Sequence, residues 1–350
     1  MTLHTDDLIA RGLVAPERLT DLRRVAAQFA VAVTEEMAAL IDSADPKDPI
    51  AAQFVPSAAE LDTTADDQAD PIGDERWSPL PGLVHRYHDR VLLKPILTCP
   101  VYCRFCFRRE QVGKGRGVLA PAALDRAFAY IAAHPEIWEV IVTGGDPFLL
   151  SPRRIAAIVG RLEAVPHLAV IRFHTRVPVA DPRRASAALV AALAAQKALY
   201  VVIHVNHPRE LTPAMRDAVG RLVRAGIPVL SQSVLLRGVN DDAAVLEALL
   251  RGLVAMRVKP YYLHHPDLAR GTGHFQLGIA EGQRIVGALR GRVSGLCQPT
   301  YVLDIPGGYG KVPLTPSAAA PGERPGSWVV EDPAGRTHPY PPPATTAADS

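Results

Sequence analysis

Short apolar runs rich in β-branched residues alternate with amphipathic stretches along most of the chain from residue 91 onward. These runs predict strands at residues 91–97, 139–143, 169–174, 199–204, 228–234 and 259–263. Six strand–helix repeats favour a parallel sheet, and their regularity favours a partial (β/α)6 TIM-type barrel with catalytic groups after the carboxyl ends of the strands. The sequence therefore predicts an α/β fold, with this barrel at residues 83–315 and a last apolar strand at 300–303.

The segments outside the barrel predict simpler structures. Residues 6–12 and 16–42 have the apolar spacing of two helices. Residues 44–82 contain repeated Asp-Pro pairs and predict a connection with little regular structure that wraps the next domain. Residues 1–82 thus form an N-terminal helical region with its connection. Residues 316–350 are rich in Pro, Ala and Gly, and predict a largely disordered tail around one short strand at 327–331.

Composition limits the possible partners. The 350 residues are 48% hydrophobic, which is ample for the core of a globular protein. The 38 basic and 36 acidic residues give no global field for binding nucleic acid, so nucleic acid is not an expected substrate. Because charges interrupt every apolar stretch before it could span a bilayer, we expect no membrane partner either.

Three of the four cysteines follow the first predicted strand. Cys99, Cys103 and Cys106 have the spacing Cys-x3-Cys-x2-Cys, which can hold three irons of a [4Fe-4S] cluster and leave the fourth iron open to another ligand. A structural zinc site would need a fourth, closed ligand, and Cys297 lies far downstream without a partner. A disulfide scaffold is disfavoured because the chain opens without a secretory signal, so we expect the reducing cytoplasm.

Polar groups follow the later strands as well. Gly144-Gly145-Asp146-Pro147 follows the second strand, where two residues without Cβ let the backbone approach a ligand closely, although the same letters also make ordinary turns. The other groups are His174-Thr175-Arg176 after the third strand, His204, Asn206 and His207 after the fourth, Gln232 at the end of the fifth, and His264, His265 and Asp267 after the sixth.

Lys311 follows a glycine cluster at the end of the predicted barrel. The sequence Pro-Gly-Gly-x-Gly-Lys at 306–311 predicts a flexible approach that lets the amine of Lys311 enter a cavity. There it could form a Schiff base with an aldehyde cofactor, for which pyridoxal 5′-phosphate (PLP) is the obvious candidate.

Together these motifs resemble the lysine 2,3-aminomutase family, whose members are radical S-adenosyl-L-methionine (SAM) enzymes that also use PLP. The resemblance covers residues 87–313. Its motifs are Tyr-His-Asp-Arg at 87–90, the cysteine loop with Arg108-Arg109, Gly-Gly-Asp-Pro, His-Thr-Arg-Val-Pro, Asn-His-Pro, Tyr-Tyr-Leu at 261–263, Ser-Gly at 294–295 and the Lys311 loop. It implies a barrel of the radical SAM class, a 5′-deoxyadenosyl radical, a flavodoxin- or ferredoxin-type reductant, and migration of an amino group from the α- to the β-carbon of L-lysine.

The resemblance also implies a role for individual residues. Lys311 would hold PLP. Tyr87 and Arg90 would bind PLP and its phosphate, Gly144, Gly145 and Asp146 would contact the amino group of SAM, His204 and Gln232 would lie near SAM, Arg108 would pair with the substrate α-carboxylate, and Asp267 and Asp304 would face the ε-ammonium group.

Several alternatives to an isomerase acting on free lysine stay open. His264 and Phe107 depart from the free-lysine enzymes and resemble a shorter branch that modifies a lysine for elongation factor P, whereas the Lys311 loop and Asp304 look more like the free-lysine enzyme. A glutamate-specific aminomutase would need a different side-chain pocket. The remaining alternatives are a SAM-cleaving enzyme without PLP and a scaffold that has lost catalysis, although a scaffold would not need the complete set of site residues.

Overall fold

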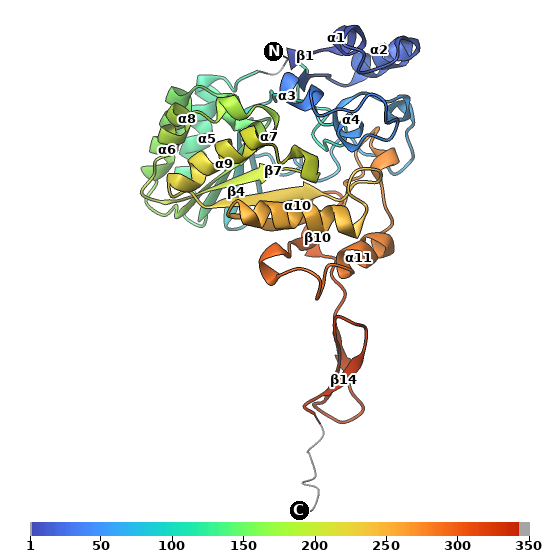
Figure 1. Cartoon of the computed structure of the whole chain (residues 1–350). Coiled ribbons are helices and arrows are strands. Elements are labelled where there is room, and N and C mark those ends of the chain that lie inside the picture. The colour runs from blue at the N-terminus through green and yellow to red at the C-terminus, as the bar shows by residue number, and fades with distance from the viewer. Residues whose placement is uncertain (1, 116, 343–350) are drawn as a thin grey trace, which may run out of the picture.

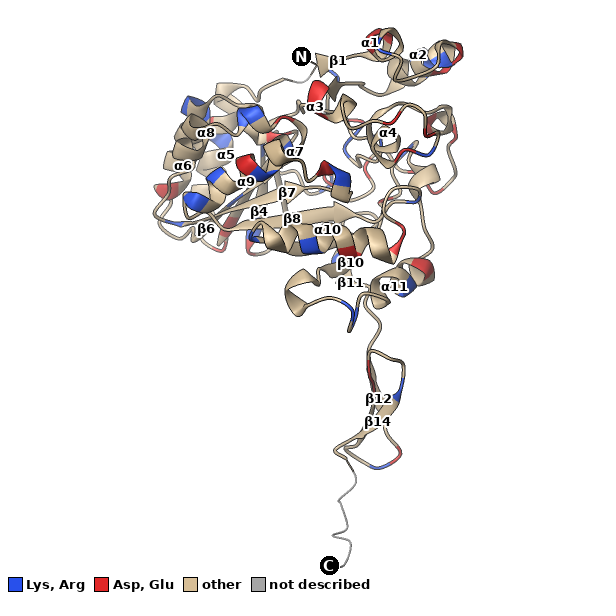
Figure 2. Cartoon of the chain, in the orientation of Figure 1, with Lys and Arg blue, Asp and Glu red and all other residues tan. Residues whose placement is uncertain are grey.

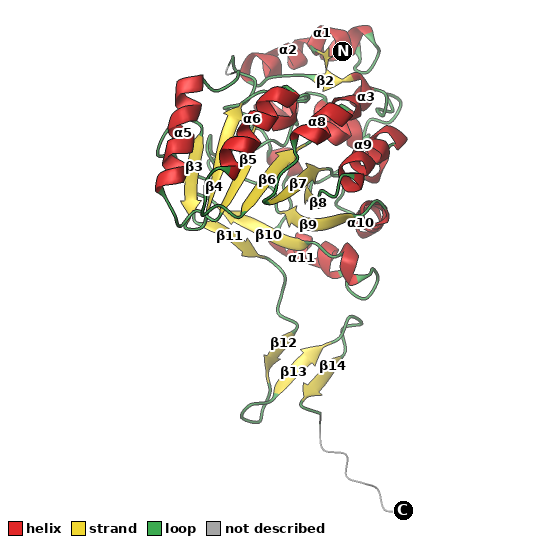
Figure 3. Cartoon of the chain, turned by 90° about the vertical axis from the view of Figure 1, so that its left-hand side faces the viewer, coloured by secondary structure: helices red, strands yellow, loops and turns green. Residues whose placement is uncertain are grey.

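A mixed nine-stranded sheet forms the centre of the computed structural model, which describes residues 2–115 and 117–342. Its strands follow the order β11-β10-β9-β8-β7-β6-β5-β4-β3 and curl into a nearly closed barrel (Figure 3). The parallel strands are β4 (Arg90–Ile96), β5 (Glu139–Gly144), β6 (Val170–Thr175), β7 (Ala198–His204), β8 (Val229–Val234), β9 (Val258–His264) and β10 (Thr300–Ile305). The predicted α/β barrel and every strand predicted for it are confirmed.

Antiparallel strands form the two edges of the sheet. β3 (Leu83–Tyr87) pairs with β4, and β11 (Gly310–Pro313) pairs with β10, where Lys311 lies opposite Asp304. Neither edge strand was predicted, because neither run is long or uniformly apolar. We call the line along which β3 faces β11 the seam of the barrel.

Helices cover the outer face of the sheet (Figure 1). They are α5 (Pro121–Ala133), α6 (Pro152–Glu163), α7 (Val177–Ala180), α8 (Ala187–Ala192), α9 (Pro213–Arg224), α10 (Ala243–Ala255) and α11 (Ile279–Gly287). Their starts follow from local chemistry: the side chains of Ser151, Thr212 and Asp242 accept backbone N–H groups of the first turn.

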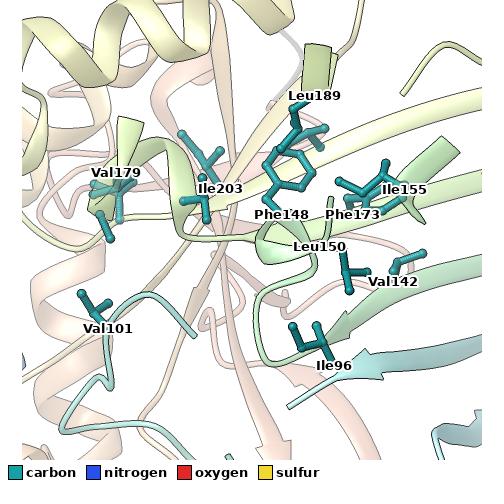
Figure 4. Packing of buried hydrophobic residues seen from close by; sticks show 14 of the residues in the cluster. Ile96, Val101, Val142, Phe148, Leu150, Ile155, Phe173, Val179, Leu189 and Ile203 are labelled. Atoms are coloured by element: carbon teal, nitrogen blue, oxygen red, sulfur yellow. The ribbon is translucent and has the colours of Figure 1, made fainter. Parts of the chain in front are cut away.

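A continuous apolar core lies between the sheet and these helices. Phe148, Phe173, Ile155 and Leu189 come from different elements and pack together in Figure 4, and all four are almost fully buried. Outward-facing strand residues build this core. The alternate residues point into the barrel, so that Arg172 and His174 of β6 face its interior.

The N-terminal region corrects one prediction. Helix α1 (Thr5–Ala10) agrees with the first predicted helix, but the single helix predicted at 16–42 is wrong: α2 (Leu19–Gln28) ends at Phe29, which has extended backbone angles. Strand β2 (Val33–Thr34), paired with β1 (Thr2–Leu3), and the short α3 (Glu35–Ala38) follow. The apolar side chains continue at helical spacing, yet the backbone of 30–32 is used by the cysteine loop, because Tyr102 N–H donates to the carbonyl of Ala32 at 3.0 Å.

The predicted connection at 44–82 has mostly irregular structure, apart from α4 (Pro49–Phe54) and a short 3₁₀ segment at Ala58–Leu61. The tail differs more from expectation. Strands β12 (Ala319–Pro321), β13 (Trp328–Glu331) and β14 (Thr337–Tyr340) form an antiparallel sheet that projects from the barrel, so the prediction of a largely disordered tail is wrong for 319–340. Its predicted end at 343–350 lies outside the described residues.

The surface of the barrel carries mixed charge. Basic and acidic residues are interspersed over α6, α8, α9 and α10 in the view of Figure 2, which agrees with the nearly balanced composition. Among residues 2–115 and 117–342, the helices are all too short or too polar to cross a membrane.

Candidate functional site

The cysteine loop begins at the carboxyl end of β4. Cys99, Cys103 and Cys106 are free thiols that line one hollow together with Phe29 and Tyr102. Across the part of the chain that the structure describes, no three His, Cys, Asp or Glu side chains converge on a point where a single metal ion could bind. Each thiolate of an iron–sulfur cluster binds its own iron, so these sulfurs need not converge. The loop therefore suits a cluster better than a closed zinc site.

A buried ion triad fixes this loop to the N-terminal connection. The guanidinium groups of Arg104 and Arg109 both donate to the carboxylate of Glu60, which is completely buried. Burial alone would raise the pKa of Glu60, but the two guanidinium groups hold that pKa below its usual value. Arg109 also donates to the carbonyl of Gly271 at 2.9 Å. The triad thus joins three distant segments, and sequence reasoning missed Glu60 because no motif surrounds it.

The Gly-Gly-Asp-Pro turn after β5 packs directly on the start of the cysteine loop. The N–H groups of Gly145 and Asp146 donate to the carbonyls of Ile96 and Thr98 at 2.7 and 2.9 Å. A Cβ atom on Gly145 would lie 2.6 Å from the nitrogen of Thr98, and Gly144 has φ = +105°. The glycines were expected to admit a ligand, and the structure shows that they admit the backbone next to the first cysteine.

The carboxylate of Asp146 is occupied within the protein. It accepts the hydroxyl of Thr175 at 2.7 Å and the N–H groups of Arg176 and Val177 at 2.7 and 3.0 Å. The Oδ1 atom that accepts the Thr175 hydroxyl also accepts the N–H of Phe148 at 3.0 Å. Asp146 therefore ties the turn to the end of β6, and we expect any contact of the turn with a cofactor to use its backbone.

Lys311 lies at the seam beside Asp304. Its Nζ is 2.6 Å from Asp304 Oδ1, and its backbone N–H donates to the phenolic oxygen of Tyr87 at 2.8 Å. Asp304 also has Arg86 at 3.7 Å and His264 Nδ1 at 3.6 Å. Burial favours the neutral acid, but hydrogen bonds and charge from His264 and Lys311 hold the pKa of Asp304 well below its usual range. The carboxylate is thus kept ionised.

The glycine loop before Lys311 is packed, contrary to the flexible approach predicted for it. Gly307 N–H donates to the carbonyl of Pro71 at 3.0 Å, and the carbonyl of Gly308 accepts Trp77 Nε1 at 3.1 Å. A Cβ atom on Gly308 would lie 2.7 Å from that same indole nitrogen, and one on Gly73 would lie 2.8 Å from the backbone of Gly307. The glycines allow two backbone segments to touch, and this contact fixes the position of the lysine.

Tyr87 and Arg90 approach Lys311 from the amino-terminal end of β4, because they flank the β3–β4 turn. The guanidinium of Arg90 lies 3.8 Å from the centre of the Tyr87 ring, and that of Arg86 lies 5.3 Å from it. Not every predicted site residue therefore follows the carboxyl end of a strand. The buried Arg86, whose Nε has no partner among the described residues, is a further member that sequence reasoning missed.

Arg108 is held by a carboxylate that no motif indicated. Its Nε donates to Asp74 Oδ2 at 2.8 Å, and Lys94 Nζ lies 3.5 Å from the same oxygen. Asp74 is almost fully buried, and its second oxygen has no hydrogen-bond partner among the described residues. Burial and the nearby Arg108 lower the pKa of Lys94. Two cationic groups thus share one carboxylate at this point of the interior.

Asp267 has a different environment from Asp304. Among the described residues, its carboxylate makes neither a hydrogen bond nor an ion pair, whereas its carbonyl accepts Gln276 Nε2 at 2.8 Å. Burial and the neighbouring carboxylate of Asp304 raise the pKa of Asp267 to about 7. Within the described part of the chain, Asp267 therefore has no cationic group in contact, whereas the neighbouring carboxylate of Asp304 is paired with Lys311.

Comparison with known proteins decides the family. Residues 93–249 match the Radical SAM superfamily. The chain is 41% identical over 304 residues to L-lysine 2,3-aminomutase of Acetoanaerobium sticklandii, covering 87% of this chain and 73% of that protein. It is 41% identical over 287 residues to the enzyme of the same name from Clostridium subterminale, covering 82% and 69%. This chain belongs to the lysine 2,3-aminomutase family. A glutamate 2,3-aminomutase of Clostridioides difficile is 35% identical over 295 residues, covering 84% and 70%.

As a radical SAM aminomutase, the protein is an isomerase whose cofactors include a [4Fe-4S] cluster and SAM. His204, which was predicted to lie near SAM, has a polar atom that is free to bind a ligand. The Nε2 atom of His204 is buried without a partner among the described residues, and its ring stacks on Phe105 of the cysteine loop, with 5.5 Å between ring centres. Burial and the nearby Arg176 lower the pKa of His204 far below its usual value, so the ring is neutral. Gln232 lies beside His204 in the register of β7 and β8.

His174 is a further interior residue of this aminomutase, although no role was predicted for it. Its Nε2 is buried without a partner in the described residues. Burial and the charges of Arg172, Arg108 and Lys311 lower its pKa far below the usual value, so this ring is also neutral. Because the charges of Arg108 and Lys311 both act on His174, these predicted site residues lie near one part of the barrel interior.

Proposed function

We propose that this aminomutase converts L-lysine to β-lysine and that it uses PLP attached to Lys311. The observation that supports lysine as the substrate is the carboxylate of Asp267, which lies beside Asp304 without a cation in contact among the described residues. A half-buried carboxylate that lacks a partner favours the approach of a cation or a proton, and desolvation together with the charge of Asp304 raises the pKa of Asp267. The ε-ammonium group of lysine supplies that cation, because it lies at the end of a long flexible side chain.

The other end of the substrate would be held by Arg108. Its guanidinium can form a bidentate pair with an α-carboxylate, and Lys94 adds a second positive charge. In the structure both groups contact Asp74. Asp74 keeps them oriented and partly neutralised before the substrate carboxylate arrives, which lowers the cost of burying two cations.

The residues around Lys311 fit PLP. Tyr87, Arg86 and Arg90 lie together, and the unpartnered Nε of buried Arg86 can donate to a phosphate oxygen. Asp304 orients Nζ of Lys311 over 2.6 Å. When bound, PLP supplies a conjugated ring that delocalises electron density from the migrating nitrogen, and SAM with the cluster supplies the carbon radical that removes and returns a substrate hydrogen.

The part of the protein in this chemistry is to bind, orient and enclose. Arg108 and the two aspartates fix both ends of lysine, so that its β-carbon has one position in the cavity. The neutral rings of His174 and His204 line the interior without adding charge near the reacting carbons. The barrel wall and the wrapping connection exclude water and other hydrogen donors from a radical.

The aspartates argue against glutamate as the substrate. A glutamate side chain would bring a third carboxylate toward Asp267 and Asp304, and like charges that approach one another away from water repel strongly. Lysine destined for elongation factor P would use the same pair of aspartates, and His264 next to Asp304 is the residue that departs toward that branch. A one-electron reductant of the flavodoxin or ferredoxin type remains part of this proposal, because the cluster must gain an electron before it can cleave SAM. A cytoplasmic location also remains part of it, because the cluster needs reduced thiols.

The test is anaerobic reconstitution with iron, sulfide and PLP, followed by incubation with SAM, dithionite and either L-lysine, L-glutamate or unmodified elongation factor P. Of the three substrates, we expect only free L-lysine to give a product, β-lysine, by mass spectrometry. Formation of β-glutamate, or modification of the factor without free β-lysine, would overturn the proposal that free lysine is the substrate. Borohydride trapping followed by peptide mapping should find PLP on Lys311, and PLP on another residue, or activity without PLP, would overturn the cofactor proposal.

A further inference from the structure

Arg176 belongs to the His-Thr-Arg-Val-Pro motif, yet neither substrate nor PLP binding assigns it a role. Its backbone N–H is held by Asp146 at the end of β6, and its side chain reaches toward the cysteine loop. Nη1 lies 2.9 Å from Cys103 Sγ. Among the described residues, no other charged side chain donates to a cysteine sulfur. Of the three cysteines, Cys103 alone accepts a hydrogen bond from a cationic side chain in the part of the chain that the structure describes.

Buried partners fix the direction of this guanidinium. Nη2 donates to Gln53 Oε1 at 2.8 Å and to Glu210 Oε2 at 3.1 Å. Gln53 Nε2 in turn donates to Glu210 Oε1 at 2.8 Å, and Asn206 Nδ2 donates to Gln53 Oε1 at 3.1 Å. Arg176 is 6% exposed, and both Gln53 and Glu210 are completely buried. These hydrogen bonds hold the guanidinium against Cys103.

We propose that Arg176 raises the reduction potential of the [4Fe-4S] cluster through its hydrogen bond to Cys103, and that Glu210 limits this effect. Hydrogen bonds to cluster sulfurs and nearby charge set the potential of iron–sulfur centres. A fixed cation in a site shielded from water stabilises the cluster more after it has gained an electron than before. Glu210 carries the opposite charge on the far side of the guanidinium, so it offsets part of that stabilisation. Arg176 acts through Cys103 and is a positioning residue rather than a catalytic one.

The inference rests on the proposed ligation of the cluster by Cys103, and the experiment separates the two. The full chain is reconstituted anaerobically and titrated without SAM or substrate, with electron paramagnetic resonance of the reduced cluster as the readout. The variants are Arg176→Gln, Arg176→Lys, Glu210→Gln and, as the control, Arg221→Gln. Arg221 is an arginine of α9 that donates to the carbonyls of Pro182 and Ala185 on the outer face of the barrel.

For Arg176→Gln we expect the equilibrium constant for reduction to fall by about tenfold, which is about 59 mV for a one-electron couple. Arg176→Lys, which retains the charge, should recover part of the loss, and Glu210→Gln should move the potential in the opposite direction. Equal potentials for Arg176→Gln and Arg221→Gln, at full iron and sulfide content, would overturn the inference. If Arg176→Gln does not retain a cluster, Glu210→Gln decides, because an unchanged or lower potential there is incompatible with the proposal. Failure of the unaltered protein to assemble any [4Fe-4S] centre would instead overturn the ligation.

Discussion

The backbone N–H of Lys311 donates a 2.8 Å hydrogen bond to the phenolic oxygen of Tyr87, and this bond joins the two edge strands of the sheet. The residues are 224 positions apart in the sequence. Tyr87 belongs to β3 and Lys311 to β11, so the proposed cofactor lysine sits where the barrel closes on itself. The same hydrogen bond that closes the barrel therefore fixes the backbone position from which the Lys311 side chain extends.

Loss of the Tyr87 hydroxyl should weaken both the wall and the cofactor site. Tyr87→Phe leaves the N–H of Lys311 without its partner in a half-buried position, which should lower the free energy of unfolding by about 1 kcal/mol. Urea denaturation measures this change, and titration with PLP should show weaker binding. Tyr309→Phe is the matched control, because the Tyr309 ring is 70% exposed. Equal effects of the two variants would contradict the role given to Tyr87.

Asp267 should govern the affinity for lysine. Asp267→Asn removes the negative charge that is left without a counter-ion, and a hydrogen bond to a charged group contributes about 1.5–3 kcal/mol. We therefore expect KM for lysine to rise by about 10- to 100-fold with a smaller change in kcat, measured by β-lysine formation. Asp217→Asn on the surface of α9 is the control and should leave KM unchanged. An unaltered KM for lysine in the Asp267→Asn variant would show that Asp267 does not bind the substrate.

The same carboxylate predicts a pH dependence. Burial and Asp304 raise the pKa of Asp267 to about 7, and only the ionised form pairs with an ammonium group. In the free enzyme, kcat/KM for lysine should be highest above pH 7 and should fall by about tenfold per pH unit below it. The Asp267→Asn variant should have lost this limb of the profile. An unchanged acidic limb in the variant would assign the ionisation to another group.

Asp304 should stabilise the fold in a pH-dependent way. Its pKa lies well below the usual 3.8 in the folded protein, so its contribution to stability is complete above about pH 5 and is lost only below pH 4, as the pH falls toward the folded-state pKa. Breaking a buried ion pair costs about 3 kcal/mol, so Asp304→Asn should lower the free energy of unfolding by that order at pH 7. The deficit relative to the unaltered protein should be nearly unchanged at pH 4 and should shrink only at lower pH. Asp125→Asn, from a surface pair with Arg161, should change stability by less than about 0.5 kcal/mol at either pH.

The Gly-Gly turn gives a steric prediction. Gly145→Ala places a methyl group against the backbone of Thr98, so the turn and the cysteine loop must separate and the protein should fail to retain iron and sulfide. Gly160→Ala on α6 has open space around it, and it should be neutral or slightly stabilising, by up to about 1 kcal/mol. Iron and sulfide analysis after reconstitution distinguishes the two. Full iron and sulfide in the Gly145 variant would contradict the close packing.

The sequence predicted the barrel because its strands are continuous apolar runs, a pattern that depends only on burial of both faces. It failed where backbone contacts between distant segments override local preference. The helix predicted through Phe29 ends because the carbonyls of Ala30 and Ala32 are needed by Arg104 and Tyr102. In the same way, the glycines before Lys311 predicted flexibility, although their surroundings hold them in place.

The predicted site residues came from motifs, and the residues that support them did not. Glu60, Asp74 and Arg86 lie in or next to the irregular connection, where nothing in the local pattern distinguishes a buried charge from a solvated one. Asp146 shows the reverse case, since its motif is correct but its carboxylate faces the protein. Which charges are buried is decided by tertiary packing, and a single sequence does not reveal it.

The irregular connection also sets an order of events in the life of the chain. Residues 53–77 leave the ribosome early, but they contact the cysteine loop through Glu60, Arg108 through Asp74, and the Lys311 loop through Trp77, whose partner Gly308 is 231 positions later. A contact of such sequence separation requires the closure of a long loop and is therefore slow to form. The surroundings of Lys311 therefore become complete only after nearly the whole barrel has been synthesised, later than the contacts of the connection with Arg104 and Arg108, which span only 44 and 34 residues.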